Sequence, residues 1–173
     1  MKTIYYVAMS LDGFIADADE SVDWLEQVSI DPEASDYDSF FAGVDGLLMG
    51  RKTFDFVYNY GQWPYGDKPT WVCSNREVPS IKGCNLQSQH GPLAAMQQAK
   101  QKGISTLWVV GGGQLASVLL ETGQLTHLSI SVMPILLGGG TPLVKFLPKH
   151  VYLSQMKSTP MSGFTQIEYQ VFA

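Results

Sequence analysis

Phosphate binding is the first chemistry that the residue types of this chain suggest. Gly50 is followed by Arg51, Lys52 and Thr53, so two cations and a hydroxyl stand where a helix is expected to begin. The first turn of a helix has unpaired backbone N–H groups and a partial positive charge, and both favour a bound phosphate. Arginine adds a forked donor that matches phosphate geometry. The alternative interpretation is an exposed, basic helix start without a ligand.

The two arginines of the chain, Arg51 and Arg76, both follow predicted strands. Arg76 comes directly after Ser74 and Asn75, which are small and polar. If the two strands are neighbours, both cations meet at one end of the sheet. Such a pair suits the extra 2′-phosphate of NADP better than the bare ribose of NAD, which an acidic residue usually recognises. On that condition the sequence favours NADPH as the cofactor.

A run of three glycines, Gly111-Gly112-Gly113, separates an apolar stretch from a helix-like stretch. With Ala116 it formally satisfies G-x-G-x-x-G/A, the fingerprint of Rossmann dinucleotide-binding folds. That fold also needs an acidic residue about 20 positions further on and more βαβ units. The chain has SISVMP in that region and few residues beyond it, so we reject the Rossmann fold. Two interpretations remain, namely close approach of the backbone to a ligand or a crowded turn.

Strand and helix patterns alternate along the chain and must position these residues. Apolar, β-branched and aromatic stretches predict strands, and amphipathic stretches ended by glycine predict helices. The order predicts a three-layer α/β domain with a mixed, mainly parallel sheet, helices on both faces and a C-terminal antiparallel hairpin. Such sheets bind ligands at the carboxyl ends of their strands. The predicted strands are 3–10, 44–50, 70–74, 104–110, 125–134, 152–159 and 164–172, and the predicted helices are 21–28, 35–44, 51–60, 91–103 and 113–123.

The composition limits the class of protein. The 173 residues have ordinary hydrophobic and charged content, so we expect one soluble domain over residues 1–173. The net charge of −5 argues against general nucleic-acid binding. Membrane spans are not expected, because no apolar stretch is long enough. Cys73 and Cys84 lack metal-ligand spacing and the histidines are scattered, so we expect no metal and a cytoplasmic location.

Four motifs follow one another along the chain. They are Ala8-Met9-Ser10-Leu11-Asp12-Gly13 with Ile15-Ala16, then VDGLLMGRKT from Val44 to Thr53, then Val110-Gly111-Gly112-Gly113, and PILLGGGTP from Pro134 to Pro142. In this order they resemble the dihydrofolate reductase superfamily. More narrowly, they resemble the C-terminal reductase domain of the bifunctional riboflavin biosynthesis protein, here standing alone. The resemblance covers nearly the whole chain.

This resemblance implies an NADPH-dependent reductase of a small heterocycle, often a homodimer. It implies that Asp12 lines the substrate side of the hydride-transfer site and that the peptide between Gly112 and Gly113 is cis. Ala8 and Ile15 would bracket the nicotinamide. The full set of implied cofactor-binding residues is Ala8, Ile15, Gly50, Arg51, Lys52, Thr53, Ser74, Asn75, Arg76, Gly111, Gly112, Gly113, Gln114 and Leu115.

The chain departs from both branches of the superfamily at the positions of their catalytic and substrate-facing carboxylates. Folate reductases have a catalytic carboxylate before the MGRKT strand, and counting back to its position gives Ala34, with Asp36 and Asp38 close by. A surface role is open for both. In the riboflavin branch a substrate-facing glutamate stands where this chain has Val110. The H-x-E and P-C-x-x-C motifs of the fused zinc deaminase do not occur.

Three functions therefore stay open. The first is a reductase of a pyrimidine or pteridine-like heterocycle, similar to 5-amino-6-(5-phosphoribosylamino)uracil reductase, with Asp12 and Asp36 as catalytic candidates. The second is a dihydrofolate reductase. The third is an NADP-binding protein without turnover, because the proton donor is unassigned. Trp63-Pro64-Tyr65 is either an aromatic lid over a flat substrate or a loop packed on the sheet.

Overall fold

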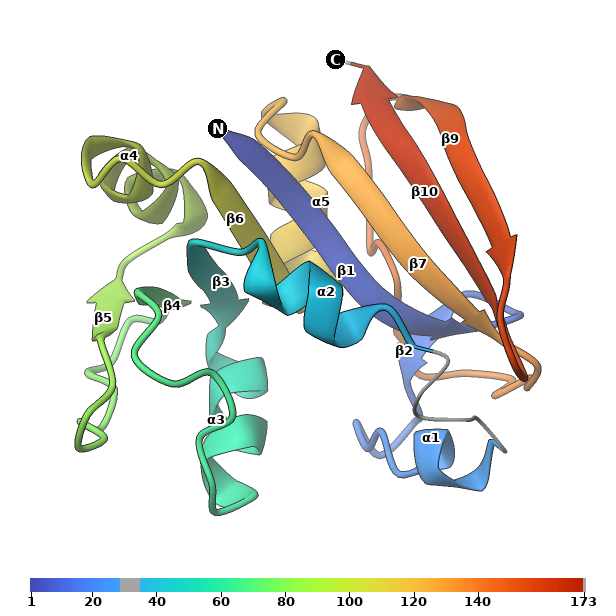
Figure 1. Cartoon of the computed structure of the whole chain (residues 1–173), viewed down its shortest axis with the longest axis horizontal. Coiled ribbons are helices and arrows are strands. Elements are labelled where there is room, and N and C mark those ends of the chain that lie inside the picture. The colour runs from blue at the N-terminus through green and yellow to red at the C-terminus, as the bar shows by residue number, and fades with distance from the viewer. Residues whose placement is uncertain (29–34, 173) are drawn as a thin grey trace.

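A mixed sheet of eight strands organises the chain, and Figure 1 shows helices in front of it and behind it. The computed structural model describes residues 1–28 and 35–172. Across the sheet the strand order is β5-β4-β3-β6-β1-β7-β10-β9. Their bounds are β1 Lys2–Ser10, β3 Gly46–Gly50, β4 Thr70–Cys73, β5 Leu86–Gln89, β6 Thr106–Gly111, β7 His127–Met133, β9 Tyr152–Pro160 and β10 Thr165–Phe172.

The strands from β5 to β7 in this order are parallel to one another. β10 is antiparallel to β7, and β9 is antiparallel to β10, so these two strands form a hairpin at one side of the sheet. In Figure 1, β1, β3 and β7 run downward, so their carboxyl ends lie at the lower edge. The predicted mainly parallel sheet with a C-terminal antiparallel hairpin is confirmed.

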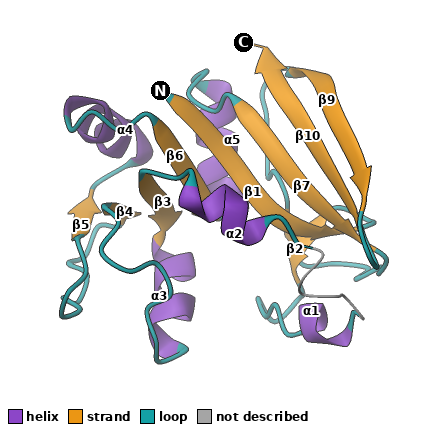
Figure 2. Cartoon of the chain, viewed as in Figure 1, coloured by secondary structure: helices purple, strands orange, loops and turns teal. Residues whose placement is uncertain are grey.

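Helices cover both faces of the sheet, as Figure 2 shows. On one face α2 (Tyr37–Ala42) and α3 (Arg51–Asn59) contribute to a core around Leu47, Met49 and Phe54. On the other face α4 (Pro92–Gln101) and α5 (Gly113–Glu121) pack on Leu48, Leu107 and Val109. Because β3 is buried on both sides, its sequence GLLMG is apolar throughout. The three-layer prediction is confirmed.

An aromatic cluster attaches α2 to the sheet. Tyr6 on β1 stacks on Phe40, with ring centroids 4.1 Å apart, and Trp108 on β6 meets both rings edge-on. The Trp108 indole also donates a hydrogen bond of 3.1 Å to the Tyr6 carbonyl. A helix of six residues is too short to be stable alone. Its position over β1 therefore depends on these aromatic contacts.

A second, small sheet lies at the carboxyl edge of the parallel strands. It pairs β2 (Phe14–Ala16) with β8 (Thr141–Pro142), and α1 (Trp24–Gln27) follows β2 in the chain. The segment 134–143 thereby crosses the ends of β7 and β1. The Leu143 N–H donates to the Gly13 carbonyl at 2.9 Å, which fastens the far end of this segment.

The structure differs from the predicted elements at polar and crowded positions. β5 was not predicted, because LQSQ is polar and half-buried and carries no apolar signal. β8 was not predicted either, since its two residues pair only with the distant β2. The helix predicted over 21–28 is limited to Trp24–Gln27, and its N-cap is Asp23 rather than Ser21. The Trp63–Tyr65 loop packs on the core, with Tyr65 7% exposed, as the alternative to a lid predicts.

Gly140 allows a stability test of the segment 134–143. It has a φ of 135°, and a β carbon there would lie 2.1 Å from the Ala16 carbonyl oxygen. We expect Gly140→Ala to lower the free energy of unfolding by about 1–3 kcal/mol or more, from strain and the clash together. Urea titration measures this change.

Gly139→Ala is the matched control, because a β carbon at Gly139 would meet nothing within 4 Å. We expect it to change the free energy of unfolding by less than about 0.5 kcal/mol. Equal effects of the two substitutions would show that the close approach at Gly140 does not restrain the segment.

Candidate functional site

The predicted site residues gather at the carboxyl edge because the strands that precede them are neighbours. Gly50 at the end of β3 is the register partner of Cys73 at the end of β4. Met49 pairs with Gly111 on the other side. The condition set for the two arginines, that their strands lie side by side, is therefore met.

Two helices begin side by side at this edge. α3 starts after Gly50 and α5 starts after Gly112, and neither helix has a side-chain cap. A β carbon at Gly50 would lie 4.0 Å from the Gly111 carbonyl oxygen, which shows how closely the two starts approach. Each start has unpaired N–H groups and a partial positive charge. Two adjacent starts suit a ligand with two linked phosphates.

Each glycine of the run 111–113 has a separate steric cause. A β carbon at Gly111 would lie 3.2 Å from Thr53 Oγ1, and one at Gly113 would lie 2.3 Å from the Pro142 carbonyl oxygen. Gly112 has a φ of 107°, which other residues rarely adopt. The turn is thus crowded, and the crowding places the start of α5 beside Thr53. The peptide between Gly112 and Gly113 is trans, so the cis peptide implied by the resemblance is wrong.

Arg51 connects α3 to the loop after β4. Its Nε donates to Asp55 Oδ1 at 2.7 Å, and its Nη1 donates to the Glu77 carbonyl at 3.1 Å and to Ser74 Oγ at 3.4 Å. Ser74 Oγ in turn accepts from the Arg76 N–H at 3.0 Å and donates to the Arg76 carbonyl at 2.6 Å. The backbone of Arg76 is therefore fixed, while its side chain is exposed.

Lys52 and Asn75 stand at the solvent side of this edge. The Lys52 ammonium pairs with Glu20 of the β2–α1 loop, and both side chains are largely exposed. Such a pair contributes little stability, so a phosphate can replace the carboxylate at low cost. Asn75 is exposed beside Arg76. Gln114 and Leu115 lie in the first turn of α5, where Gln114 is exposed and Leu115 is buried in the core.

The Asp12 carboxylate joins the turn after β1 to the segment 134–143. It accepts hydrogen bonds from Ser10 Oγ at 2.7 Å, from the Leu137 N–H at 3.1 Å and from the Gly138 N–H at 2.7 Å. The bond from Ser10 lowers the pKa of the Asp12 carboxyl most, and the two N–H groups lower it further. Asp12 is thus ionised at neutral pH and holds a loop.

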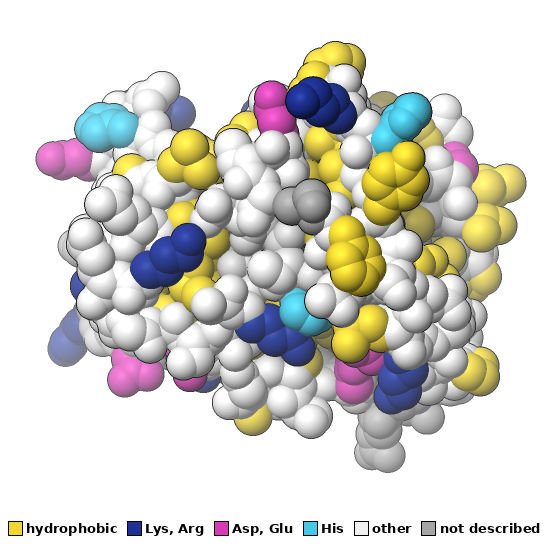
Figure 3. All heavy atoms as spheres, turned by 90° about the horizontal axis from the view of Figure 1, so that it is seen from above, with side chains coloured by type: hydrophobic (Ala, Val, Ile, Leu, Met, Phe, Trp, Pro, Cys, Tyr) yellow, Lys and Arg dark blue, Asp and Glu magenta, His cyan; other side chains and the backbone are white. Residues whose placement is uncertain are grey.

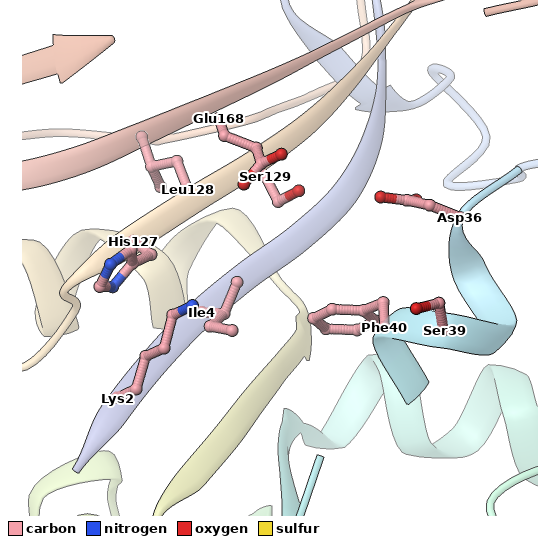
Figure 4. Close-up of a pocket in the computed structure, with 9 residues that line it drawn as sticks. All are labelled: Lys2, Ile4, Asp36, Ser39, Phe40, His127, Leu128, Ser129 and Glu168. Carbon is pink, nitrogen blue, oxygen red and sulfur yellow. The ribbon is translucent and has the colours of Figure 1, made fainter. Parts of the chain in front are cut away.

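Asp36 lies at the start of α2 and is bonded to β1. The Tyr6 hydroxyl donates to Asp36 Oδ1 at 2.8 Å. The pKa of Tyr6 is raised, most strongly by burial and further by this hydrogen bond. Ala34, the counted position of the folate carboxylate, lies outside the described residues, and Asp38 is exposed on α2. Figure 4 shows Asp36 at the rim of a hollow of about 190 Å³. Lys2, Ile4, Asp36, Ser39, Phe40, His127, Leu128, Ser129 and Glu168 line it.

A second hollow, of about 350 Å³, lies on the same face of the sheet, nearer the carboxyl edge. Its floor is low because Ala8 and Ser131, register partners on β1 and β7, are both small. We call it the floor hollow. It is near the lower end of the range of small-molecule sites, roughly 300–1,000 Å³. Tyr6, Ala8, Leu25, Ser35, Tyr37, Ser131, Met133 and Phe164 line it.

The floor hollow contains residues that the sequence did not point to. Only Ala8 was predicted as a site residue. Ser131 and Leu25 carry no motif, and their meeting depends on strand pairing and on the placement of α1. The signal that was available is the small residue at one position in each of two neighbouring strands. Ile15 lies half-buried on β2, and Val110 packs against the core around Phe54.

Within residues 1–28 and 35–172, no three His, Cys, Asp or Glu residues are grouped so that they could hold a metal ion. Over the same residues, no helix is long and apolar enough to cross a membrane. On the face opposite the carboxyl edge, Figure 3 shows charged side chains of both signs mixed with exposed apolar ones.

The chain has a dihydrofolate-reductase-like fold. Dihydrofolate reductase from Enterococcus faecalis, solved with NADP(H), shares 13% identity and covers 99% of this chain and 97% of its own, with a TM-score of 0.64. The Thermotoga maritima diaminohydroxyphosphoribosylaminopyrimidine deaminase/5-amino-6-(5-phosphoribosylamino)uracil reductase is also 13% identical, with a TM-score of 0.68 over 99% of this chain and 56% of its own. At these identities the likeness shows the fold alone.

Closer relatives define the family. Residues 62–165 match the RibD C-terminal domain family. YwjB of Bacillus subtilis (strain 168), named an uncharacterized protein, is 31% identical over 169 residues, which is 94% of this chain and 92% of YwjB. The crystal structure of a "Putative riboflavin biosynthesis protein" from Shewanella sp. PV-4 is 31% identical, covers both chains completely and has a TM-score of 0.86. The chain belongs to the RibD C-terminal domain family.

The role of Asp12 predicts a pH dependence. Because its folded-state pKa is lowered, its stabilising contribution is present above the ordinary carboxyl pKa, about 3.9, and is lost as the pH falls through the lower folded value. We therefore expect the Leu137 and Gly138 amides to stay protected from hydrogen exchange below pH 4, and to lose protection on further acidification. NMR-detected exchange measures this.

Asp12→Asn should remove much of that protection already at neutral pH, because a neutral amide is a weaker acceptor for two N–H groups. Asp19→Asn is the matched control, since it removes one charge from the same acidic stretch without removing a bond to Leu137 or Gly138. Unchanged exchange in Asp12→Asn would refute the loop-holding role.

Proposed function

We propose that this protein is an NADPH-dependent reductase of a pyrimidine or pteridine-like heterocycle. The observation that carries the proposal is the pair of uncapped helix starts, α3 and α5, side by side at the carboxyl edge. The reductases among the structural neighbours support it, one of them solved with NADP(H) and another named a uracil reductase. Family membership supports the same class of chemistry.

The residues at the two helix starts fit the phosphates of this cofactor. The N–H groups at the starts of α3 and α5 are free of side-chain caps, and Thr53 lies between them. Lys52 can exchange Glu20 for a phosphate. When bound, NADPH supplies the hydride. The chain's own part is to hold the cofactor and to keep its nicotinamide end near Ala8, at the floor hollow.

The proposed preference of the protein for NADPH over NADH rests on Arg76. The loop from Ser74 to Glu77 is held by Arg51 and by the Ser74 hydroxyl, so the exposed Arg76 guanidinium starts from a fixed backbone. A forked cation at a fixed position suits a phosphate monoester. We propose that Arg76, with Ser74 and Asn75, meets the 2′-phosphate.

The floor hollow is the proposed substrate site. Ala8 lines it, and its walls are mainly apolar and aromatic. Flat heterocycles bind well between aromatic and apolar side chains. The relative from Shewanella sp. PV-4, named for riboflavin biosynthesis, supports a substrate similar to the aminouracil of that pathway.

The two predicted carboxylates have different parts in this proposal. Asp12 holds the segment 134–143 and so shapes the substrate side of the site. Asp36 is bonded to Tyr6, and Tyr6 lines the floor hollow while Asp36 lines the neighbouring hollow, open to water. We assign proton supply to this Tyr6–Asp36 pair. Asp36 takes up a proton from water and donates it to the Tyr6 oxygen, which reverses the hydrogen bond between them, and Tyr6 passes its own hydrogen to the heterocycle.

The cofactor proposal is tested by Arg76→Ala with NADPH and NADH. We expect the affinity for NADPH to fall at least about tenfold, or about 1.4 kcal/mol, and the affinity for NADH to stay unchanged. Calorimetric titration gives both constants. Lys82→Ala is the control, because Lys82 is an exposed cation of the same β4–β5 connection. Equal losses for the two cofactors, or no loss, would contradict the assignment.

Turnover is tested separately from binding. NADPH oxidation is followed with the aminouracil intermediate and with dihydrofolate, and we expect the former to be the better substrate. Faster turnover of dihydrofolate would favour the alternative reductase. A protein that binds NADPH tightly but oxidises it with neither compound would favour a binding protein without turnover.

The Tyr6–Asp36 assignment predicts that Asp36→Asn lowers kcat at least roughly tenfold with little change in KM, as loss of a proton-transfer group does. Asp38→Asn, on the exposed side of the same helix, is the control and should keep the kcat of the original protein. A normal kcat in Asp36→Asn would exclude the pair from proton supply. The homodimer implied by the resemblance and the cytoplasmic location expected from the cysteine usage stay predictions, and sedimentation measures the first.

A further inference from the structure

A buried hydrogen-bonded trio lies in the sheet beneath and beside the floor hollow. Gln166 on β10 is the register partner of Ser131 on β7, and Ser129 lies two residues away on the same strand. All three side chains are on the face that carries the hollow. Their exposed fractions are 2% for Gln166, 5% for Ser131 and 9% for Ser129. A glutamine buried this deeply needs partners for both ends of its amide.

The two serines are those partners. The Ser131 hydroxyl donates to Gln166 Oε1, and Gln166 Nε2 donates to Ser129 Oγ at 2.7 Å. Glu168 is the register partner of Ser129, and Figure 4 shows the two side chains close together. A negative charge on that side favours the NH₂ end of the amide there and the oxygen end toward Ser131.

This orientation decides what Ser131 can offer to a ligand. A hydroxyl has one hydrogen to donate and two lone pairs that accept. The hydrogen of Ser131 is committed to Gln166 Oε1. Ser131 lines the floor hollow, so a ligand that reaches its hydroxyl meets lone pairs alone. It is therefore a hydrogen-bond acceptor with a fixed direction.

We propose that Ser131 accepts a hydrogen bond from a ring N–H of the heterocycle, and that Gln166 is a positioning residue that keeps the Ser131 hydroxyl from acting as a donor. The inference rests on the proposed function, because it concerns the same substrate site. It narrows the substrate to heterocycles with an N–H on the edge that faces the sheet. Rings that present a carbonyl or an alkylated nitrogen there are rejected.

The surroundings of Ser131 make this selection strong. Ala8 and Met133, next to it on the sheet, offer no strong hydrogen-bonding group. The Tyr6 hydroxyl donates its hydrogen to Asp36, so its oxygen is a second acceptor, at the wall of the hollow. A ligand N–H that reaches the floor without an acceptor stays unpaired and loses its hydrogen bonds to water. Unpaired buried polar groups are costly, so one acceptor at the floor can decide between similar rings.

Two uracils that differ in their ring N–H groups test the proposal. 5,6-Diaminouracil has them, and 5,6-diamino-1,3-dimethyluracil carries methyl groups in their place. Binding of each compound is measured by calorimetry, with and without NADP⁺. We expect Ser131→Ala to weaken 5,6-diaminouracil about tenfold and to leave the dimethyl compound unchanged or bound more tightly.

Gln166→Met tests the positioning role, because methionine keeps the length of the side chain and removes its acceptor. Ser131 can then rotate and donate, so the preference for 5,6-diaminouracil over the dimethyl compound should fall several-fold. Ser129→Ala is the matched control. It removes one hydrogen bond from the same glutamine but leaves the bond from Ser131 in place, so the preference should persist even if the melting temperature falls.

Equal effects of Ser131→Ala on both compounds, or no effect on either, would overturn the inference. So would a folded Gln166→Met variant that keeps the full preference, or failure of the original protein to bind either uracil. NADPH binding in the same samples is independent of these outcomes. If it persists, the cofactor part of the proposed function stands, and if it is absent while the uracils still bind and discriminate, that part fails alone.

Discussion

The parallel pairing of β3 with β6 is the constraint on which the rest of the candidate site depends. It places Met49 beside Gly111, so the helices that follow the two strands begin next to each other. Neither helix has a side-chain cap, and their N–H groups are left for a ligand. The neighbouring pair of β3 with β4 adds the loop of Arg76. In the proposed function, the ends of backbone elements would recognise most of a phosphate-rich ligand, and the arginines would contribute selectivity between related ligands.

The substrate side depends on a different feature, the small side chains of the sheet. Ala8 and Ser131 leave the floor hollow, because larger residues at these partner positions would fill it. The aromatic contacts of Tyr6 with Phe40 place α2 as its wall. Packing around Trp24 and Phe164 supports the opposite side. The residue types that form the hollow are common, and only their arrangement in the fold brings them together. The hollow therefore has no sequence motif, unlike the carboxyl edge with its proposed cofactor loops.

That difference explains what could be predicted from the sequence. Local patterns predicted the strands, the hairpin and the helix starts, because apolar periodicity and terminal glycines act within a few residues. That the strands before Arg51 and Arg76 are neighbours was a condition that the sequence alone could not establish, because it depends on the order of the strands in the sheet. β5 was missed because its four residues are polar, and the floor hollow was missed because Ser131 carries no signal of its own. Motifs pointed to the proposed cofactor loops, whereas the floor hollow depends on pairing between distant strands.

Asp12 and the glycine run belong to motifs whose residues have structural roles in this fold. Asp12 binds two backbone N–H groups of the segment 134–143, and the same segment needs Gly113 to be without a side chain, since the Pro142 carbonyl lies against it. The SLDG, GGG and LLGGGTP motifs are therefore parts of one contact that runs from the end of β1 to the start of α5. Loosening the segment at Asp12 would disturb the substrate side directly and the start of α5 indirectly. These motifs share one packed contact, and in the proposed function the segment 134–143 would connect the cofactor side of the site to its substrate side.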